Sequence, residues 1–551
     1  MASLSKVDRA ASPRAETRPA RRLKFWGWGY EDEVVPPGEI QWMESAWSER
    51  FGVVGFANVV PTPKAEHIKL PVSRLPVPST LAAICTTDHY ERVLHSYSKS
   101  LPDIIRVYAR ECPAPVDVVA LPRNEQDIVD LLDWAYRANA AVVPFGGGSS
   151  VVGGVVPPSG GEYAGAISID MRNLDRVLEI DETSLAARIQ AGTFGPSLEE
   201  QLKPSGLTLR HFPQSFKCST LGGWIATRAG GHFATLYTHI DDLVESTRLV
   251  TPSGLVETRR LPGSGAGPSP DRMFIGSEGI LGIITEAWMR VRRRPTFRAT
   301  STVRFTDFYQ GCDAVRALTQ SGLYPANCRI LDAEEAQYNG IADGRHSVLV
   351  VAFESDDHPV EPWMNRALEL CCDHGGEPEV ASTEENSNRE GGAGRWRDRF
   401  MFLPYFKEHM VARGIFRDAY ETSITWDRFK DFHANIKDAG LKAIEKATGR
   451  RGSVTCRFTH AYPDGPAPYL TFHGLSQTQD RIMEDYWAVK GAASDAIIAG
   501  GGTITHHHAV GREHRPWYDR QRPELFANAL RAAKKSLDPK GLLNPGVLID
   551  P

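Results

Sequence analysis

Three consecutive histidines, His506, His507 and His508, are the residues in this sequence best suited to proton transfer. An imidazole titrates near neutral pH, so it can both accept and release a proton. The triplet follows the glycine-rich segment Gly500–Thr505. In an extended chain, His506 and His508 would face one way and His507 the other. A solvated cluster is the alternative. A metal site would need a carboxylate or further histidine at ligand spacing, and the neighbouring sequence has neither, so no metal is predicted.

A second pair of chemical groups comes from a β-hairpin predicted over residues 453–472. Its first strand contains Arg457, and its second strand, after a turn at Pro463-Asp464-Gly465, contains Tyr469. A tyrosine hydroxyl can donate or accept a proton, and a guanidinium can hold a negatively charged group. Residues of these types in a hairpin are equally common as packing or surface residues, so the sequence leaves both interpretations open.

The segment best suited to positioning a ligand is Val142–Val151, in which an apolar strand leads into Gly146-Gly147-Gly148 and two serines. Glycine lets a backbone come close to a ligand, and successive N–H groups in such a turn form a concavity that suits pyrophosphate. The segment has neither the G-x-G-x-x-G pattern nor the Gly-Lys-Ser/Thr of a P-loop. Taken alone, it is also compatible with a flexible turn.

Two further blocks of small residues follow this first glycine block. The second, Gln214–Gly231, places hydroxyl residues and Gly222-Gly223 ahead of a short apolar helix, and helix N-termini attract phosphate oxygens. The third, Gly276–Thr285, interrupts a β-rich run with glycines, as occurs where a backbone passes close to a ligand. Three such blocks in order, with strands between them, are far more specific than any one of them.

Length and composition limit the class of protein. A chain of 551 residues is too long for one ordinary core, so two or more domains are expected. The net charge of −5 is not the basic charge that is typical of nucleic-acid-binding proteins. The sequence contains no apolar run of about 18 residues that could span a membrane. The eight cysteines are scattered without a C-x-x-C, which suits a reducing compartment. The N-terminus has no apolar signal segment, and the C-terminus has no Ser-Lys-Leu address.

The order of helical and strand-like segments predicts an α+β protein. Strands alternate with helices around the three glycine blocks, and a later region of strands and amphipathic helices is expected to form an α+β cap with an antiparallel sheet. Within that cap, residues 376–397 are expected to form a mobile loop. The predicted division is a disordered tail over 1–20, an arm over 21–96, a ligand-binding domain over 97–295, the cap over 296–505 and a C-terminal segment over 506–551 that returns to the site.

The three blocks resemble the FAD domain of the vanillyl-alcohol-oxidase family, which is also called the PCMH type and has two subdomains. The resemblance implies that the first block contacts the pyrophosphate, the second the pyrophosphate and flavin, and the third the flavin and adenosine side. Some relatives attach FAD through a histidine near the first block; none lies in Phe145–Val151 or just ahead of it, so non-covalent FAD is expected. The implied cofactor-binding residues are Pro144, Phe145, Gly146, Gly147, Gly148, Ser149, Ser150, Gln214, Ser215, Ser219, Thr220, Gly222, Gly223, Thr227, Arg228, Ala229, Gly230, Glu278, Gly279, Ile280, Leu281, Gly282, Ile283 and Ile284.

A closer resemblance is to the alkyldihydroxyacetonephosphate synthases (alkylglycerone-phosphate synthases), flavoenzymes that make the ether bond of ether lipids. It covers most of residues 22–551. The motifs that carry it best are Trp26-Gly27-Trp28-Gly29, Arg329-Ile330-Leu331-Asp332 and His506–Gly511. The implied activity exchanges the acyl group of acyl-dihydroxyacetone phosphate for a fatty alcohol without net redox change.

The same resemblance assigns roles to individual residues. Tyr469 matches the catalytic acid/base tyrosine of the family, the histidine triplet matches its essential histidines, and Arg329 matches an arginine needed for activity. Arg457 lies in a matched motif and is assigned to substrate binding. Lys407 stands where the family has a substrate-binding arginine. Lysine keeps the charge but loses the two-pronged geometry, so phosphate binding is expected to differ here.

Two alternative functions share the FAD domain: an FAD-dependent oxidase or dehydrogenase of a 2-hydroxy acid, and a catalytically inactive flavin-binding scaffold. For the synthase we expect lipid substrates, an apolar channel between residues 296 and 430, peripheral membrane contact, a homodimer and no nucleic-acid partner. The N-terminal peroxisomal signal of eukaryotic synthases is not recognised, because Gly29-Tyr30 stands where His-Leu should follow Arg22-Leu23. A cytoplasmic protein is therefore expected.

Overall fold

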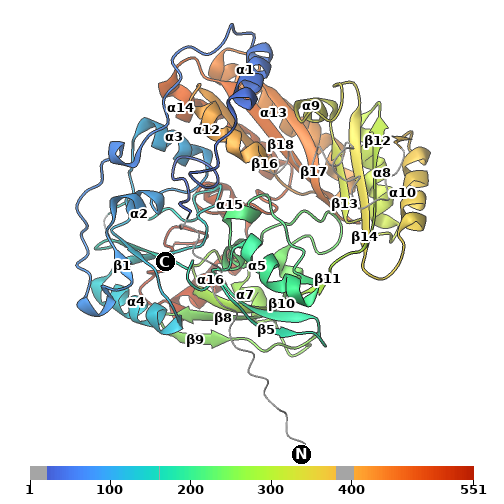
Figure 1. Cartoon of the computed structure of the whole chain (residues 1–551). Helices are drawn as coiled ribbons and strands as arrows, with labels where there is room; N and C mark the ends of the chain where they lie inside the picture. Colours follow the sequence, from blue (N-terminus) through green and yellow to red (C-terminus); the bar gives the residue numbers. More distant parts are fainter. Residues whose placement is uncertain (1–20, 161, 380–401, 551) are drawn as a thin grey trace, which may run out of the picture.

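The computed structural model describes residues 21–160, 162–379 and 402–550. Three large sheets organise these residues into the predicted α+β fold. In Figure 1 the five-stranded sheet lies at the bottom, and the seven-stranded sheet with its helices extends across the top and right. The tail at 1–20 and nearly all of the loop expected at 376–397 fall outside the described residues.

The first sheet places the first glycine block. Strands β2, β4 and β3 are parallel, so their carboxyl ends meet at one edge, and the glycines begin directly where β3 ends. Helix α4 (Glu125–Ala138) covers this sheet; the Asn124 side chain caps it by accepting the N–H of Asp127. Its buried positions recur at the predicted helical spacing. The strand order is β1 (Cys85–Thr86), β2 (Val118–Ala120), β4 (Ala166–Asp170) and β3 (Ala141–Phe145).

The second sheet is antiparallel and places the other two glycine blocks. The third block leads directly into its central strand, and the second block forms helix α6 (Leu221–Thr227), which packs on it. Helices α5 (Gly195–Leu202) and α7 (Asp271–Phe274) lie nearby. The strand order is β5 (Val177–Asp181), β6 (Ala186–Gln190), β10 (Ile283–Arg290), β8 (Val244–Thr251) and β9 (Gly254–Glu257); β7 (Leu207–Thr208) and β11 (Arg292–Arg293) form a separate pair.

The third sheet, which we call the cap sheet, is antiparallel and has seven strands. The hairpin predicted over residues 453–472 forms its strands β17 and β18, which are joined by a turn at Tyr462–Gly465. The strand order is β15 (Glu377–Pro378), β12 (Phe297–Phe305), β14 (Ser347–Ser355), β13 (Asn327–Leu331), β17 (Ser453–Ala461), β18 (Pro466–Leu475) and β16 (Ile415–Glu421).

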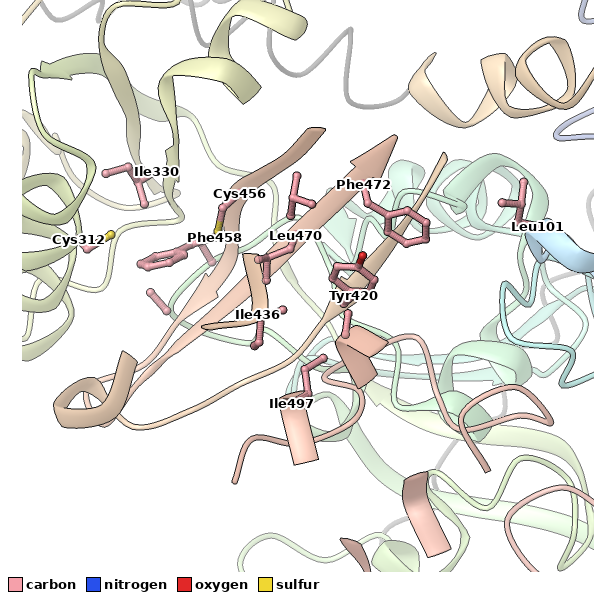
Figure 2. Packing of buried hydrophobic residues seen from close by; sticks show 14 of the residues in the cluster. Leu101, Cys312, Ile330, Tyr420, Ile436, Cys456, Phe458, Leu470, Phe472 and Ile497 are labelled. Atoms are coloured by element: carbon pink, nitrogen blue, oxygen red, sulfur yellow. The ribbon is translucent and has the colours of Figure 1, made fainter. Parts of the chain in front are cut away.

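Alternation along β17 and β18 gives this part of the cap sheet one apolar and one polar face. Figure 2 shows Cys456, Leu470 and Phe472 on the apolar side, with Ile436 and Ile497 from two helices packed near them. Each fully buried side chain of this kind contributes about 1.5–3 kcal/mol by leaving water. The helices on this side are α13 (Trp426–Thr448) and α14 (Ile482–Ala499), while α8 (Phe308–Gln320) and α10 (Glu361–Asp373) pack against β12 and β14. The polar face of β17 and β18 can line a site, while helix α9 (Ala333–Tyr338) packs beside it against β14 and β17.

The N-terminal arm packs onto the cap rather than extending into solvent. Trp28 and Trp47 are buried in one cluster with Phe406 and Met410. The helices near the N-terminus are α1 (Pro37–Phe51), α2 (His89–Leu94) and α3 (Leu101–Ala109). In the cap, α12 (Lys407–Val411) packs against β16. The predicted domain boundaries themselves stay a prediction.

The C-terminal segment returns to the first sheet. Val142 N–H donates to the Leu542 carbonyl at 2.8 Å, and Asn544 N–H donates to the Val142 carbonyl at 2.8 Å. This segment includes helices α15 (Arg515–Gln521) and α16 (Glu524–Leu537). Among the described residues, no helix combines the length and apolar character needed to cross a membrane.

Candidate active site

The first glycine block packs directly against the second. A Cβ atom on Gly147 would stand 1.8 Å from the Cys218 carbonyl oxygen, and one on Gly146 would stand 2.3 Å from Thr220 Oγ1. Gly148 has a φ of +63°, which glycine adopts without the strain of a side chain. Residues with side chains would push the two blocks apart, so the glycines are what brings both backbones to one cavity.

Glu278 ties the third glycine block to the C-terminal segment. Its buried carboxylate accepts hydrogen bonds from the backbone N–H groups of Val510 and Gly511, both at 2.8 Å. Burial raises the pKa of Glu278 to about 7, although these two donors oppose the rise. The Asn544 amide donates to the Glu278 carbonyl oxygen at 2.8 Å. The chain just after the histidine triplet is thus fixed to a predicted cofactor-binding block.

Two adjoining cavities lie among the glycine blocks and the cap sheet. The first has a volume of about 680 Å³ and is lined by all three blocks. The second, of about 1050 Å³, extends from the first two blocks to the polar face of the cap sheet. The two cavities are neighbours, because both are lined by Gly146, Ser150, Val155, Thr220, Gly223 and Thr227.

Most predicted cofactor-binding residues line one of these cavities, and three do not. Arg228 points away and pairs with Asp241, Nε to Oδ2 at 2.8 Å. Ile280 and Leu281 are buried in the core of the five-stranded sheet. The remaining residues predicted from the three blocks all line the cavities, so a nucleotide cofactor would contact all three blocks.

The polar face of the cap sheet brings the predicted catalytic side chains together. Arg457 on β17, Tyr469 on β18 and Glu421 on β16 are direct cross-strand partners. Directly opposed residues share a face in an antiparallel sheet, so the three form one row. Leu331 on β13 pairs with Arg457, and Arg329 lies two residues before it, on the same face. The register of four strands therefore builds one wall of the second cavity.

Tyr469 lies over a positive charge. The Arg457 guanidinium carbon is 4.0 Å from the centroid of the Tyr469 ring. Burial raises the pKa of Tyr469 above its usual value, and the charge of Arg457 opposes the rise. The ring also contacts His508 edge-on, with centroids 5.5 Å apart. A phenol beside a guanidinium and an imidazole can exchange a proton with a ligand in the cavity.

Glu421 shapes the histidine triplet. Its carboxylate accepts the backbone N–H groups of His506 at 2.7 Å, of His507 at 3.0 and 3.1 Å, and of His508 at 2.9 Å. Burial acts to raise the pKa of Glu421, but His507 and His508 outweigh it and hold the pKa well below its ordinary value. A buried carboxylate with this many donors fixes the path of the loop.

The extended conformation expected for the triplet is wrong. Residues 506–508 form a bend around Glu421, because three successive N–H groups turn toward one carboxylate. His507 and His508 both line the second cavity, whereas His506 is absent from its lining. Strict alternation would have placed His506 with His508. The two histidines of the triplet that reach the cavity are therefore His507 and His508.

His506 connects the site to residues that the sequence did not suggest. Its Nε2 lies 2.7 Å from the Tyr462 hydroxyl and 3.1 Å from His239 Nε2. Its Nδ1 lies 3.0 Å from His507 Nδ1. His460, on the same hairpin as Tyr462, adds a fourth imidazole, with ring centroids 5.0 Å from His506 and 5.4 Å from His507. The hairpin motif drew attention to this segment, but only the fold brings it to the triplet.

The two arginines are buried beside each other on the cavity wall. Arg457 forms a buried ion pair with Glu335. Arg329 Nη2 donates to the His232 carbonyl at 2.9 Å, and burial together with the charge of Arg457 lowers the pKa of Arg329 to about 9. Glu335 offsets the charge of Arg457, so the added guanidinium of Arg329 is what favours an anionic ligand in the cavity.

Lys407 lies apart from this wall. It begins helix α12, and its Nζ is 3.4 Å from Asp418 Oδ1. Burial acts to raise the pKa of Asp418, but Lys407 and Lys490 bring it down to about 2. Lys407 is not among the residues that line either cavity. Arg329, Arg457, Tyr469, His507 and His508 thus line one cavity. Lys407 and His506 do not line it.

Comparison with known proteins agrees with this geometry. Residues 116–259 match the FAD binding domain model, and residues 294–548 match the model for the C-terminal domain of FAD linked oxidases. The glycine-lined cavity and these matches define a flavoprotein of the FAD-linked oxidase class.

Individual relatives narrow the class. The chain is 32% identical over 481 residues to alkyldihydroxyacetonephosphate synthase of Dictyostelium discoideum, covering 84% of this chain and 78% of that protein. A solved alkyldihydroxyacetonephosphate synthase structure, 25% identical, superposes with a TM-score of 0.78 over 95% of this chain and 98% of that one. The glycolate oxidase subunit GlcD of Bacillus subtilis is more distant, at 26% identity over 78% of this chain and 88% of that protein.

The chain belongs to the alkyldihydroxyacetonephosphate synthase family. It is a flavin-dependent enzyme with FAD as its cofactor, as predicted, and non-covalent attachment is consistent with this family. Gly146 and Gly147 pack closely against the second block, and the cavity beside them is lined by glycines. Both features fit the binding of FAD.

Proposed function

We propose that the enzyme replaces the fatty acyl group of acyl-dihydroxyacetone phosphate with a fatty alcohol and so forms an ether without net oxidation or reduction. One observation carries the proposal: a single cavity is lined by the glycine blocks on one side and by Tyr469, His507 and His508 on the other. When bound, the flavin supplies covalent chemistry that these side chains lack.

In this proposal Tyr469 takes the proton from C1 of the substrate and returns a proton to C1 when the ether forms. Arg457, 4.0 Å from the phenol ring, stabilises negative charge on the tyrosine oxygen. The fatty acid leaves with its own oxygens, and the alcohol attacks through its oxygen and gives up its proton. His507 and His508 line the same cavity, where they handle the protons of the leaving acid and the attacking alcohol.

The substrate phosphate is assigned to the positive side of the cavity. Arg457 and Arg329 both line it, and a guanidinium suits an anionic group, which supports their binding the phosphate there. Lys407, which stands in place of the family arginine, pairs with Asp418 outside the cavity, so in this proposal it affects the bound substrate less than Arg329 and Arg457 do. It contributes charge without the bidentate fork.

The lipid nature of the substrates implies further properties. The alkyl chain would occupy an apolar channel in the cap between residues 296 and 430. In this proposal the protein is a cytoplasmic homodimer. It reaches its lipid substrates by binding to the membrane surface. The exposed apolar side chains of Val34, Trp42 and Val54 on the arm support such contact.

The direct test supplies the purified FAD-loaded enzyme with acyl-dihydroxyacetone phosphate and a radiolabelled fatty alcohol. The proposal predicts a labelled alkyl ether and one released fatty acid per ether, with no net loss of flavin absorbance. Absence of an ether, or bleaching of the flavin by a 2-hydroxy acid, would instead favour the oxidase alternative that is represented by the more distant relative.

A further inference from the structure

We propose that His460, His506 and His507 form a binding site for one divalent transition-metal ion of the Zn²⁺ type. One ring nitrogen from each of the three lies within 4.8 Å of the others. Three histidines with an open fourth position are a common protein ligand set for Zn²⁺. The sequence argued against a metal because it offered no further ligand near the triplet, whereas the fold supplies His460 from strand β17.

His460 already has the arrangement of a metal ligand. Its side chain is 1% exposed, and its Nε2 lies 3.0 Å from the Gly231 carbonyl oxygen. A carbonyl only accepts, so Nε2 carries the proton and Nδ1 carries the lone pair. Nδ1 is buried and has no hydrogen-bond partner among the described residues. Metal-bound histidines commonly donate their other N–H to a backbone carbonyl, and an ion would satisfy the remaining lone pair.

The two loop histidines are held at ligand spacing. His506 Nδ1 and His507 Nδ1 are 3.0 Å apart. Two nitrogens that each bind a tetrahedral ion at about 2.0 Å lie about 3.3 Å apart, so a shift of a few tenths of an ångström would admit the ion. The other nitrogen of His506 is held by the Tyr462 hydroxyl at 2.7 Å.

Glu421 supplies the outer charge that such a site needs. One of its carboxylate oxygens lies 3.2 Å from His507 Nδ1, and the carboxylate also holds the backbone of the loop. This negative charge offsets the nearby positive charge of Arg329. Because Nδ1 is also the nitrogen of His507 that would bind the ion, this carboxylate would lie beside the ion and offset part of its charge.

The ligand set selects the kind of ion. Imidazole nitrogens suit Zn²⁺, Ni²⁺ and Cu²⁺, while Mg²⁺ and Ca²⁺ prefer oxygen ligands. His507 lines the second cavity, so the fourth position of the ion would open toward the substrate space. An ion there would occupy imidazole lone pairs that the proposed synthase reaction uses, so Zn²⁺ would inhibit that reaction. Only this last consequence rests on the proposed function.

The test uses the FAD-loaded enzyme after dialysis against a chelator and then against metal-free buffer. Isothermal titration with ZnCl₂ should show one equivalent bound, and MgCl₂ should show none. His460→Gln keeps an N–H donor for the Gly231 carbonyl and removes the Nδ1 ligand, so its Zn²⁺ affinity should fall at least tenfold. His358→Gln, which changes an exposed histidine of the cap, is the matched control and should bind as the parent does.

X-ray absorption at the zinc edge adds a readout that folding defects do not mimic. It should show nitrogen neighbours at about 2.0 Å. The site is disproved if no saturable equivalent binds, or if His460→Gln binds as tightly as the parent. Titration needs no substrate, so an enzyme that forms no ether yet binds Zn²⁺ through His460 would support the site and count against the synthase proposal alone.

Discussion

Glu421 binds His507 through both backbone and side chain: its carboxylate accepts the His507 N–H at 3.0 and 3.1 Å, and one of its oxygens lies 3.2 Å from His507 Nδ1. Because Glu421 also pairs with Tyr469 across the sheet, one buried carboxylate sets the histidines relative to the tyrosine. The catalytic geometry therefore depends on a residue that need not touch the substrate.

Glu421→Gln should disturb the loop without removing the cofactor. The amide has one acceptor oxygen where the carboxylate has two, so at least one backbone N–H of the triplet loses its hydrogen bond to residue 421, at a cost of about 1–3 kcal/mol. We expect kcat to fall by about tenfold to a hundredfold. Flavin absorbance per protein should be unchanged. The exposed control Glu377→Gln should keep both the kcat and the flavin absorbance of the parent. Full activity of Glu421→Gln would contradict the positioning role.

Tyr469→Phe should separate the hydroxyl from the ring. The ring keeps its stacking over Arg457, so FAD content and thermal midpoint should stay close to those of the parent. Loss of a general acid or base lowers kcat by about 10²–10⁴-fold, and KM should change little. Steady-state kinetics check this; Tyr405→Phe, a tyrosine of the arm–cap contact, is the control for loss of a buried hydroxyl. Equal activity of Tyr469→Phe and parent would remove Tyr469 from the mechanism.

Gly147→Ala should block FAD binding. The new Cβ would stand 1.8 Å from the Cys218 carbonyl oxygen, and both partners are backbone, so the two glycine blocks must separate. The purified variant should have less than a tenth of the parent flavin absorbance. Gly38→Ala is the control, because a Cβ at this helical position meets nothing within 4 Å. Stoichiometric FAD in Gly147→Ala would show that the close contact is not what shapes the site.

His211 should make the enzyme sensitive to acid. Both of its ring nitrogens are buried without a hydrogen-bond partner among the described residues, and burial, helped by His239, lowers its pKa to about 3. The unfolded chain takes up this proton below about pH 6.5 and the folded chain only near pH 3, so stability falls as the pH drops through that window. At pH 5 the loss is about 2 kcal/mol.

The variant His211→Phe removes this proton uptake. Its urea unfolding should depend less on pH between 5 and 7.5 than that of the parent, and the two should differ most at pH 5. The exposed control His67→Gln should retain the parent slope. An unchanged slope in His211→Phe would mean that other groups cause the acid sensitivity.

Arg329→Met and Lys407→Met should separate the two proposed anion contacts. Removing Arg329 relieves its repulsion with Arg457, so the thermal midpoint should hold or rise while KM for the phosphate-bearing substrate increases at least tenfold. Lys407 lies outside both cavities and pairs with Asp418, so its variant should show the smaller KM change and a lower thermal midpoint. Enzyme kinetics and thermal unfolding measure both; the reverse order of KM effects would place the phosphate at Lys407.

The three glycine blocks could be found from the sequence because their signal is local. A run such as Gly146-Gly147-Gly148 restricts its own backbone whatever surrounds it. Within the blocks the sequence could not tell which side chains face the cavity. Ile280 and Leu281 lie between cavity-lining residues but point into the core, and Arg228 turns outward to Asp241.

The catalytic wall could be recognised only through the family resemblance, because strand register creates it. Tyr469 and Glu421 are 48 positions apart along the chain and adjacent in the sheet. His460 and His506 are likewise far apart along the chain but close in space, since His460 lies on a strand and His506 on a loop that reaches it. The bend of the triplet could not be predicted from the sequence either, because it is caused by the carboxylate of Glu421 on strand β16 and not by the triplet itself.

The most direct measurement of the central claim follows the oxygen of the fatty alcohol. The enzyme is incubated with acyl-dihydroxyacetone phosphate and ¹⁸O-labelled fatty alcohol, and the ether product is analysed by mass spectrometry. The account predicts that the ether carries the ¹⁸O and that an unlabelled fatty acid is released in equal amount. Recovery of the label only in unreacted alcohol, with no ether formed, would contradict it.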